Sequence, residues 1–235
     1  MRGCAVGMDA YTGYPFEAAL RADGISFICE VKKASPSKGI IAEEFDHIDI
    51  ARQYESAGAS CISVLTEPTR FLGDVRYLRE ISEAVSIPLL RKDFVVDEYM
   101  IHEAKVMGAS AVLLIVSILT DEELSRFIGL CAELGLSSLV EAHNGEEVRR
   151  AIHSGATVIG VNNRNLHDFS VDPSNCLALR DLVGDDTVFV AESGISSRDD
   201  VRMLEDAGVD AVLIGEALMR ADDKKAMLDK LRGME

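Results

Sequence analysis

The sequence lacks the features that would place the protein in a membrane, in the export pathway or on a nucleic acid. Its longest apolar run, residues 109–120, is about a dozen residues long, whereas a membrane-spanning helix needs roughly 20. No continuous apolar segment follows Arg2, so no export signal is visible. Only 24 Lys and Arg stand against 40 Asp and Glu, which leaves a formal net charge of -16 and no basic footprint. We therefore expect a cytoplasmic protein with no nucleic-acid or membrane partner, in which any anionic ligand occupies a local basic pocket.

Paired cysteines and metal-binding histidines are also missing. No two cysteines form a C-x-x-C pair, which favours reduced, buried thiols. No two histidines are spaced as a ligand pair on one helix face, so we expect no metal. His143 follows Glu141 by two residues and could reach the barrel mouth, although a surface loop is the interpretation we favour. The residues concerned are Cys4, Cys29, Cys61, Cys131, Cys176, His47, His102, His143, His153 and His167.

What is present is the composition of an ordinary globular protein, with 48% hydrophobic and 27% charged residues over 235 positions. Glycine followed by a small or apolar residue recurs where an amphipathic stretch gives way to an apolar one, at 58–59, 108–109, 135–136, 155–156 and 208–209. The spacing fits a unit of about 25 residues with two steps skipped, and glycine suits the left-handed residue that ends a helix. This pattern indicates a repeated strand and helix.

The repeat predicts eight buried strands separated by helices such as Asp121 to Leu134 and Ser197 to Ala207. The expected strands are Ile25 to Lys32, Ser60 to Thr66, Ile87 to Asp93, Ala109 to Val116, Ser137 to Glu141, Thr157 to Asn162, Thr187 to Glu192 and Asp210 to Ile214. Nearly continuous apolar strands that alternate with helices favour a parallel sheet covered by helices. We expect one α/β domain over 1–235, a single (β/α)8 TIM barrel at 25–235 with a short N-terminal extension at 1–24. A doubly wound open sheet is the alternative.

Six polar residues break the apolar pattern at the C-terminal strand ends, and each shares its parity with inward-facing apolar neighbours. They are Glu30, Lys32, Lys92, Glu141, Asn162 and Glu192. Each one alone could belong to a solvated rim. Two lysines and three carboxylates directed into one mouth would be costly to desolvate unless they are paired, and active sites of such barrels lie at this face. The set therefore predicts a functional site.

Two loops further suggest a phosphorylated ligand. Residues 193–196 follow the seventh strand and residues 215–217 follow the eighth, and each loop contains glycine and leads into a helix. Free N–H groups at a helix start can receive an anion, and these two loops are the usual phosphate site of such barrels. Lys33 and Lys38 could guide an anion or could simply be solvated.

The run from Glu30 to Gly39, Glu-Val-Lys-Lys-Ala-Ser-Pro-Ser-Lys-Gly, resembles the signature of the indole-3-glycerol-phosphate synthase family of the tryptophan pathway. The resemblance continues from about Phe16 to the C-terminus, through residues 65–67, 71, 73, 90–94, 139–141, 161–166, 191–195 and 213–216. It implies a carboxy-lyase that converts 1-(2-carboxyphenylamino)-1-deoxyribulose 5-phosphate to indole-3-glycerol phosphate by ring closure, decarboxylation and dehydration. It also implies no cofactor, no metal and no obligate protein partner.

The resemblance further implies a role for each site residue. Lys92 would be the general acid at the substrate ketone, helped by Glu30, and Glu141 would be the base of the dehydration. Lys32 would bind the substrate carboxylate or act as a second acid, and Asn162 would hold Glu141 or a substrate hydroxyl. The expected substrate-binding residues are Ser35, Phe71, Phe94, Leu113, Arg164 and Glu192. The expected phosphate-binding residues are Ser193, Gly194, Gly215 and Glu216.

Two departures from the family qualify this expectation. Glu216 would repel a phosphate through its carboxylate, so only its N–H group can help. Only 24 residues precede the first strand, whereas relatives carry a longer arm whose helices close over the barrel mouth, so we expect altered lid closure and affinity. The competing hypotheses are a phosphosugar isomerase on the same fold, such as phosphoribosylanthranilate isomerase, and a barrel that only binds a phosphometabolite or a partner chain.

Overall fold

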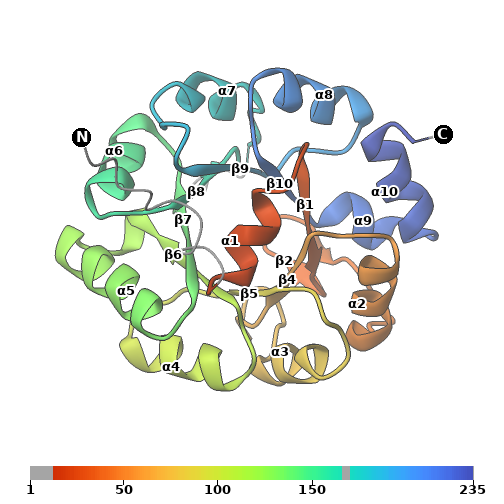
Figure 1. Cartoon of the computed structure of the whole chain (residues 1–235). Helices are drawn as coiled ribbons and strands as arrows, with labels where there is room; N and C mark the ends of the chain where they lie inside the picture. The colour runs from red at the N-terminus through yellow and green to blue at the C-terminus, as the bar shows by residue number, and fades with distance from the viewer. Residues whose placement is uncertain (1–12, 166–169, 235) are drawn as a thin grey trace, which may run out of the picture.

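Eight parallel strands close into a barrel surrounded by helices in the computed structural model, which describes residues 13–165 and 170–234 (Figure 1). Neighbouring strands follow the order β1-β10-β9-β8-β7-β6-β5-β4, and the last strand pairs with the first. Their bounds are β1 (Ser26–Val31), β4 (Cys61–Leu65), β5 (Leu89–Lys92), β6 (Ala111–Ile115), β7 (Ser137–Ala142), β8 (Val158–Asn162), β9 (Val188–Glu192) and β10 (Ala211–Ile214). The predicted (β/α)8 barrel is confirmed, and the open-sheet alternative is wrong.

The helices outside the barrel begin at side-chain caps and most of them end at glycine. Aspartate, asparagine, serine or threonine accepts a backbone hydrogen bond at the start of most helices, as with Thr120 and Ser197, which both form capping boxes. All five glycines of the predicted repeat have positive φ, between 66° and 87°, as expected at helix ends. The helices are α2 (His47–Ser56), α3 (Val75–Ser82), α4 (Glu98–Val106), α5 (Asp121–Glu133), α6 (Gly145–His153), α7 (Ser174–Arg180), α8 (Arg198–Asp206), α9 (Glu216–Arg220) and α10 (Lys224–Arg232).

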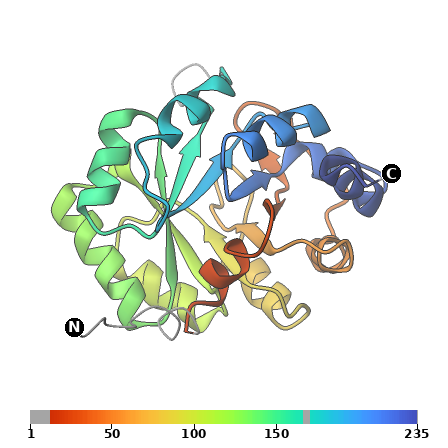
Figure 2. The same ribbon diagram turned by 45° about the horizontal axis from the view of Figure 1, so that its top comes forward.

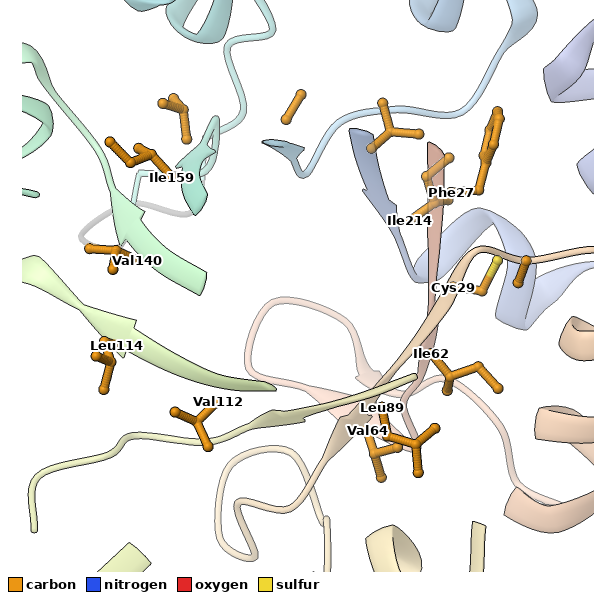
Figure 3. Close-up of a cluster of buried hydrophobic side chains, with 14 of the residues drawn as sticks. Phe27, Cys29, Ile62, Val64, Leu89, Val112, Leu114, Val140, Ile159 and Ile214 are labelled. Carbon is orange, nitrogen blue, oxygen red and sulfur yellow. The ribbon is translucent and has the colours of Figure 1, made fainter. Parts of the chain in front are cut away.

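Two hydrophobic layers hold the fold together because parallel strands are buried on both faces. The larger layer lies between the barrel and its helices and includes Phe27, Ile62, Leu114, Val140 and Ile159 (Figure 3). The smaller layer fills the barrel interior. It consists of alternate residues from the lower parts of the strands, among them Ile28, Cys61, Leu90, Ala111, Leu139, Val158, Val188 and Ala211.

A short helix, α1 (Pro15–Leu20), closes the N-terminal end of the barrel (Figures 1 and 2). Its Phe16 and Leu20 are fully buried against the interior layer. Its Glu17 accepts a hydrogen bond from Thr157 Oγ1 at the foot of β8, at 2.8 Å. The described part of the arm therefore covers the end opposite the C-terminal strand ends, which corrects the expectation that it belongs to a lid over the mouth. Residues 1–12 lie outside the described residues.

Several smaller expectations can also be compared with the structure. A two-stranded hairpin, β2 (Ala34–Ser35) and β3 (Gly39–Ile40), follows β1 and was not predicted. The four described cysteines are buried and free, whereas Cys4 and His167 lie outside the described residues. Within 13–165 and 170–234, no helix is long and apolar enough to cross a membrane.

Candidate active site

A cavity of about 820 Å³ opens at the C-terminal ends of the barrel strands. All fifteen predicted site residues line it: Glu30, Lys32, Ser35, Phe71, Lys92, Phe94, Leu113, Glu141, Asn162, Arg164, Glu192, Ser193, Gly194, Gly215 and Glu216. The six polar strand-end residues face inward because they share the parity of the interior apolar layer. The cavity volume is in the range of pockets that enclose a small metabolite.

The ammonium group of Lys92 joins two carboxylates at the base of the cavity. Its Nζ lies 3.0 Å from Glu141 Oε2 and 2.5 Å from Glu192 Oε2. Both carboxylate side chains are at least 96% removed from solvent, so these contacts form where the effective dielectric constant is low. This triad couples the ends of β5, β7 and β9.

Burial and neighbouring charge shift the pKa values of the triad in different directions. Burial disfavours the charge on Lys92, but the carboxylates of Glu192 and Glu141 outweigh it and raise the pKa of this lysine. Burial raises the pKa of Glu192 to about 7, an effect that Lys92 opposes and Glu141 reinforces. Burial acts in the same sense on Glu141, yet Lys92 and His143 more than offset it, so the pKa of Glu141 is lowered. Glu141 is thus the ionised carboxylate and Glu192 the one that can hold a proton near neutrality.

Two glycines make room for these charged groups. A Cβ at Gly160 would lie 2.2 Å from Glu192 Oε1, and a Cβ at Gly215 would lie 2.2 Å from Glu30 Oε2. Glu30 in turn forms an ion pair with Lys32 on the same strand end. Side chains at positions 160 and 215 would therefore displace the carboxylates, and glycine is required there for close approach.

One wall of the cavity is an apolar slot held by polar anchors. The rings of Phe71 and Phe94 lie 6.3 Å apart, inclined at 50°. The loop that carries Phe71 is fixed by Glu67, whose carboxylate accepts hydrogen bonds from the backbone N–H groups of Thr69, Arg70 and Phe71. Sequence reasoning missed this anchor, although an acidic residue just beyond a buried strand was a signal that could have found it.

The opposite wall contains the two glycine-bearing loops. Ser193 and Gly194 both have positive φ, 66° and 80°, and a Cβ at Gly194 would collide with Val171. The N–H groups of Ser196 and Ser197 donate to Asp200, so they are already used within the α8 cap. An incoming anion would therefore meet the earlier part of this loop rather than its end.

The carboxylate of Glu216 is neutralised by two cations on this wall. Its Oε1 lies 3.2 Å from Arg220 Nε and 3.7 Å from Lys38 Nζ. Lys38 thus takes part in an ion pair at the mouth, and the repulsion expected from Glu216 is reduced by these partners.

Comparison with known proteins gives a direct family relationship. The family model for indole-3-glycerol phosphate synthase matches residues 9–231. The indole-3-glycerol phosphate synthase of Lachnoclostridium phytofermentans is 55% identical over 219 residues, which cover 93% of this chain and 81% of the relative. That of Ruminiclostridium cellulolyticum is 53% identical over 94% of this chain and 85% of the relative. The chain belongs to the indole-3-glycerol phosphate synthase family.

Solved structures outside this family share the fold alone. Thiamine phosphate pyrophosphorylase from Pyrococcus furiosus aligns with a TM-score of 0.65 at 17% identity, covering 89% of this chain and 94% of its own. A mandelate oxidase mutant aligns with a TM-score of 0.66 at 18% identity, covering 89% of this chain and 71% of its own. Membership of the indole-3-glycerol phosphate synthase family, rather than barrel geometry, therefore narrows the chemistry of this cavity.

Two residues implied by the family resemblance are held by local contacts. Asn162 Oδ1 accepts a hydrogen bond from the backbone N–H of Arg164 at 3.0 Å, which orients the amide at the end of β8. Arg164 also pairs through its backbone with Val171 in an isolated bridge. Both side chains line the cavity, as expected for members of the indole-3-glycerol phosphate synthase family.

His143 lies closer to the site than the sequence interpretation favoured. Its ring is mostly buried, with 15% of the side chain exposed, and Nε2 lies 3.4 Å from Glu141 Oε1. The residue is therefore in a loop, as expected, but it is not on the surface, and it does not line the cavity at the mouth either. The signal was the alternation itself, because residues 141 and 143 share one parity and the strand β7 continues to Ala142.

Proposed function

We propose that this chain converts 1-(2-carboxyphenylamino)-1-deoxyribulose 5-phosphate into indole-3-glycerol phosphate, carbon dioxide and water. Relatives named for this activity, which match over most of the chain, support the reaction. The observation that carries it is the Lys92 ammonium between Glu141 and Glu192 at the base of the cavity. The buried free thiols of the described cysteines suit the reducing cytoplasm as its location.

Ring closure begins when the aromatic carbon that bears the carboxylate attacks the substrate ketone. Lys92 donates a proton to the ketone oxygen as that oxygen becomes an alkoxide. The same carboxylates that keep Lys92 protonated make it a weak acid in the free protein, so transfer occurs only as the alkoxide develops. Loss of carbon dioxide then leaves its electron pair in the ring and restores aromaticity.

Dehydration needs a base and an acid on the product of the first stage. Glu141, whose pKa is lowered, takes the proton from the carbon next to the ring nitrogen. The hydroxyl formed from the ketone leaves as water after it is protonated, and the two carbons form the double bond of the indole. Lys92 or Lys32 supplies that proton, and Glu30 holds Lys32 in its ion pair.

The remaining residues bind and orient the substrate. Phe71, Phe94 and Leu113 hold the anthranilate ring in the apolar slot. Arg164 and Lys32 face its carboxylate, while Asn162 and Ser35 contact the ribulose hydroxyls. Glu192 Oε1 is buried and accepts no hydrogen bond from the described residues, so a substrate hydroxyl completes its bonding. Backbone N–H groups of the loops at Ser193, Gly194, Gly215 and Glu216 receive the phosphate.

The test is the appearance of indole fluorescence when the purified protein meets the substrate. The chain contains no tryptophan, so the product signal has no indole background from the protein. Lys92→Ala should lower kcat by about 1000-fold, since a positioned proton donor contributes on the order of 10²–10⁴. Lys105→Ala, which removes an exposed lysine of α4, is the matched control and should leave kcat unchanged.

Two outcomes would contradict the proposal. A wild-type protein that binds the substrate without turning it over would be a binding barrel. A protein that turns over phosphoribosylanthranilate but not the carboxyphenylamino substrate would be an isomerase.

A further inference from the structure

The imidazole of His143 lies between two carboxylates behind the catalytic triad. Its Nδ1 is 3.1 Å from Glu147 Oε2 on α6, and its Nε2 is 3.4 Å from Glu141 Oε1 on β7. Glu147 Oε2 also accepts the backbone N–H of His143 at 2.8 Å, which fixes the residue at the turn between β7 and α6. The other oxygen of Glu141 meets Lys92, so this carboxylate is held from both sides.

This geometry favours the charged form of the imidazole. Nδ1 lies within hydrogen-bond distance of Glu147, whereas Nε2 is buried, has no hydrogen-bond partner among the described residues and faces Glu141 as a charged contact only. A neutral imidazole would direct a lone pair at one of the two carboxylates, whereas the imidazolium presents an N–H group to each of them. The charged groups that act on the ring are Glu141, Glu147 and Glu192, together with Lys92 on the far side of Glu141. Burial lowers the pKa of His143, but the bond to Glu147 and the charge of Glu141 outweigh it, so the pKa is raised.

We infer that His143 is a positioning residue of the reaction, which keeps Glu141 ionised and aimed at the substrate through a charged contact on its Oε1. The cavity lining in the described chain includes Glu141 but not His143, so the histidine acts through the carboxylate. The inference rests on the proposed function, in which Glu141 is the base of the dehydration. The inference adds two charged contacts in series, in which Glu147 orients the ring of His143 and His143 orients the carboxylate of Glu141.

The sign of the expected pH effect follows from the charge. Removal of the imidazolium raises the pKa of Glu141, because a neighbouring positive charge favours the carboxylate. A larger fraction of Glu141 is then protonated at a given acidic pH and cannot act as a base. The acidic limb of the kcat profile therefore moves to higher pH.

The decisive variant is His143→Gln, which retains a neutral donor in place of Nε2 but removes the charge. We expect the acidic limb of kcat to move up by about one pH unit, with kcat about 10-fold lower on that limb, since one unit corresponds to a tenfold change. KM should change less than about twofold, because the residue does not touch the substrate. His153→Asn is the matched control on α6, exposed and bonded to the Arg149 carbonyl, and should leave the profile unchanged.

Glu147→Gln tests the second contact. It should shift the limb in the same direction by a smaller amount, and the double variant with His143→Gln should behave like His143→Gln alone, because Glu147 acts through the histidine. The inference would be overturned if His143→Gln had the same dependence of kcat on pH as the wild type. It would also be overturned if the shifts of the acidic limb in the two single variants added up in the double variant.

Titration of the histidine ring protons by NMR gives a readout that needs no substrate. The ring of His143 should titrate above the ordinary imidazole value of 6.5, and the difference should shrink in Glu147→Gln. If His143 titrates at or below the ordinary imidazole value, the inference fails whatever the activity. If His143 titrates high while the wild-type protein does not turn over the carboxyphenylamino substrate, the proposed function fails and the charged contact stands.

Discussion

The two ends of the barrel interior are built from the same strands but perform opposite tasks. At the lower end, inward positions such as Ile28, Leu90 and Val158 are apolar, and α1 seals them with Phe16 and Leu20. Further along the same strands, by two residues in β1 and β5 and by four in β8, the inward positions become Glu30, Lys92 and Asn162, which line an open cavity. The lower end is a packed apolar core, whereas the upper end buries charges and glycines that stability alone would not select. Within one sheet, the position of an inward residue along its strand therefore decides whether it stabilises the core or lines the reactive cavity.

Two buried carboxylates, one at each end, show the same contrast. Glu17 at the lower end is satisfied by Thr157 and Arg21. Glu192 at the upper end shares a lysine with Glu141 and keeps one oxygen without a described hydrogen-bond partner. A carboxylate whose bonding is complete in the free protein is structural, and one whose bonding is incomplete is available for a ligand.

The largest expected effect belongs to the lower end. Phe16→Ala removes a fully buried ring from the seal and should lower the free energy of unfolding by about 3–5 kcal/mol. The kcat of the folded fraction should stay unchanged, because the triad lies at the other end of the strands. Urea unfolding and turnover of the same preparation measure both quantities, with Tyr99→Ala on exposed α4 as the control. A fall in kcat without a fall in stability would show that the two ends are not separate.

The next largest effect concerns the upper end, where we expect a substitution to lower activity and to leave stability nearly unchanged. Gly160→Ala places a methyl group 2.2 Å from Glu192 Oε1, and the carboxylate must move away from Lys92 because its side chain is the flexible partner. We expect kcat/KM to fall by about 100-fold, since a small displacement of a catalytic group has effects of this order. The free energy of unfolding should change by less than about 1 kcal/mol, because the side chain rather than the backbone yields.

Gly129→Ala provides the control for that substitution. Gly129 lies inside α5 with open space around its Cα, so alanine should raise the stability by about 0.5–1 kcal/mol and leave kcat/KM unaltered. If Gly160→Ala instead unfolds the protein without specific loss of activity, the upper end contributes to stability as the lower end does.

The sequence was sufficient for the barrel because each strand is a nearly continuous apolar run and each repeat glycine has one clear conformational role. It was sufficient for the six strand-end residues because alternation assigns a side to every side chain, and Lys92 and Glu141 stand out as charges on the inward side. It could not place α1, since six residues are too few to show which end of a barrel a helix covers. It could not predict the hairpin of β2 and β3 either, because two residues per strand carry no period.

Contacts made across the fold were the other part that the sequence could not supply. The lysine partner of Glu192 comes from β5, 100 residues earlier, and the pKa of Glu192 depends on burial that only the closed barrel creates. His143 shares a parity with Glu141, but its role depends on Glu147 holding the ring from α6. Alternation along a strand predicts which way a side chain points, whereas ion pairs depend on the distances between strands and helices, which the sequence does not give.

The smallest expected effect concerns how the buried carboxylate of Glu192 at the upper end changes the free energy of unfolding with pH. The pKa of Glu192 is about 7 in the folded protein and near its ordinary 4.5 when unfolded, so the folded chain holds a proton that the unfolded chain releases. The stability from this group is fully present below about pH 4.5 and is lost as the pH rises through about 7. Glu192→Gln, which does not titrate, should remove this part of the pH dependence. The free energy of unfolding of the wild type relative to the variant should therefore fall by about 2.5 kcal/mol between pH 5 and pH 8.

The comparison with Glu192→Gln is needed because another group titrates in the same window. The raised pKa of His143 gives stability that is present below its unfolded pKa and is lost as the pH rises. Most of this contribution remains in the variant, because Glu147 and Glu141 raise the pKa of His143 more than Glu192 does. Glu141, with its lowered pKa, loses its contribution only at pH values below the window. Urea denaturation of both proteins at pH 5, 6.5 and 8 measures the difference. Parallel curves would mean that Glu192 is ionised throughout, in which case the upper end buries two full negative charges, which Lys92 and the charged His143 must balance.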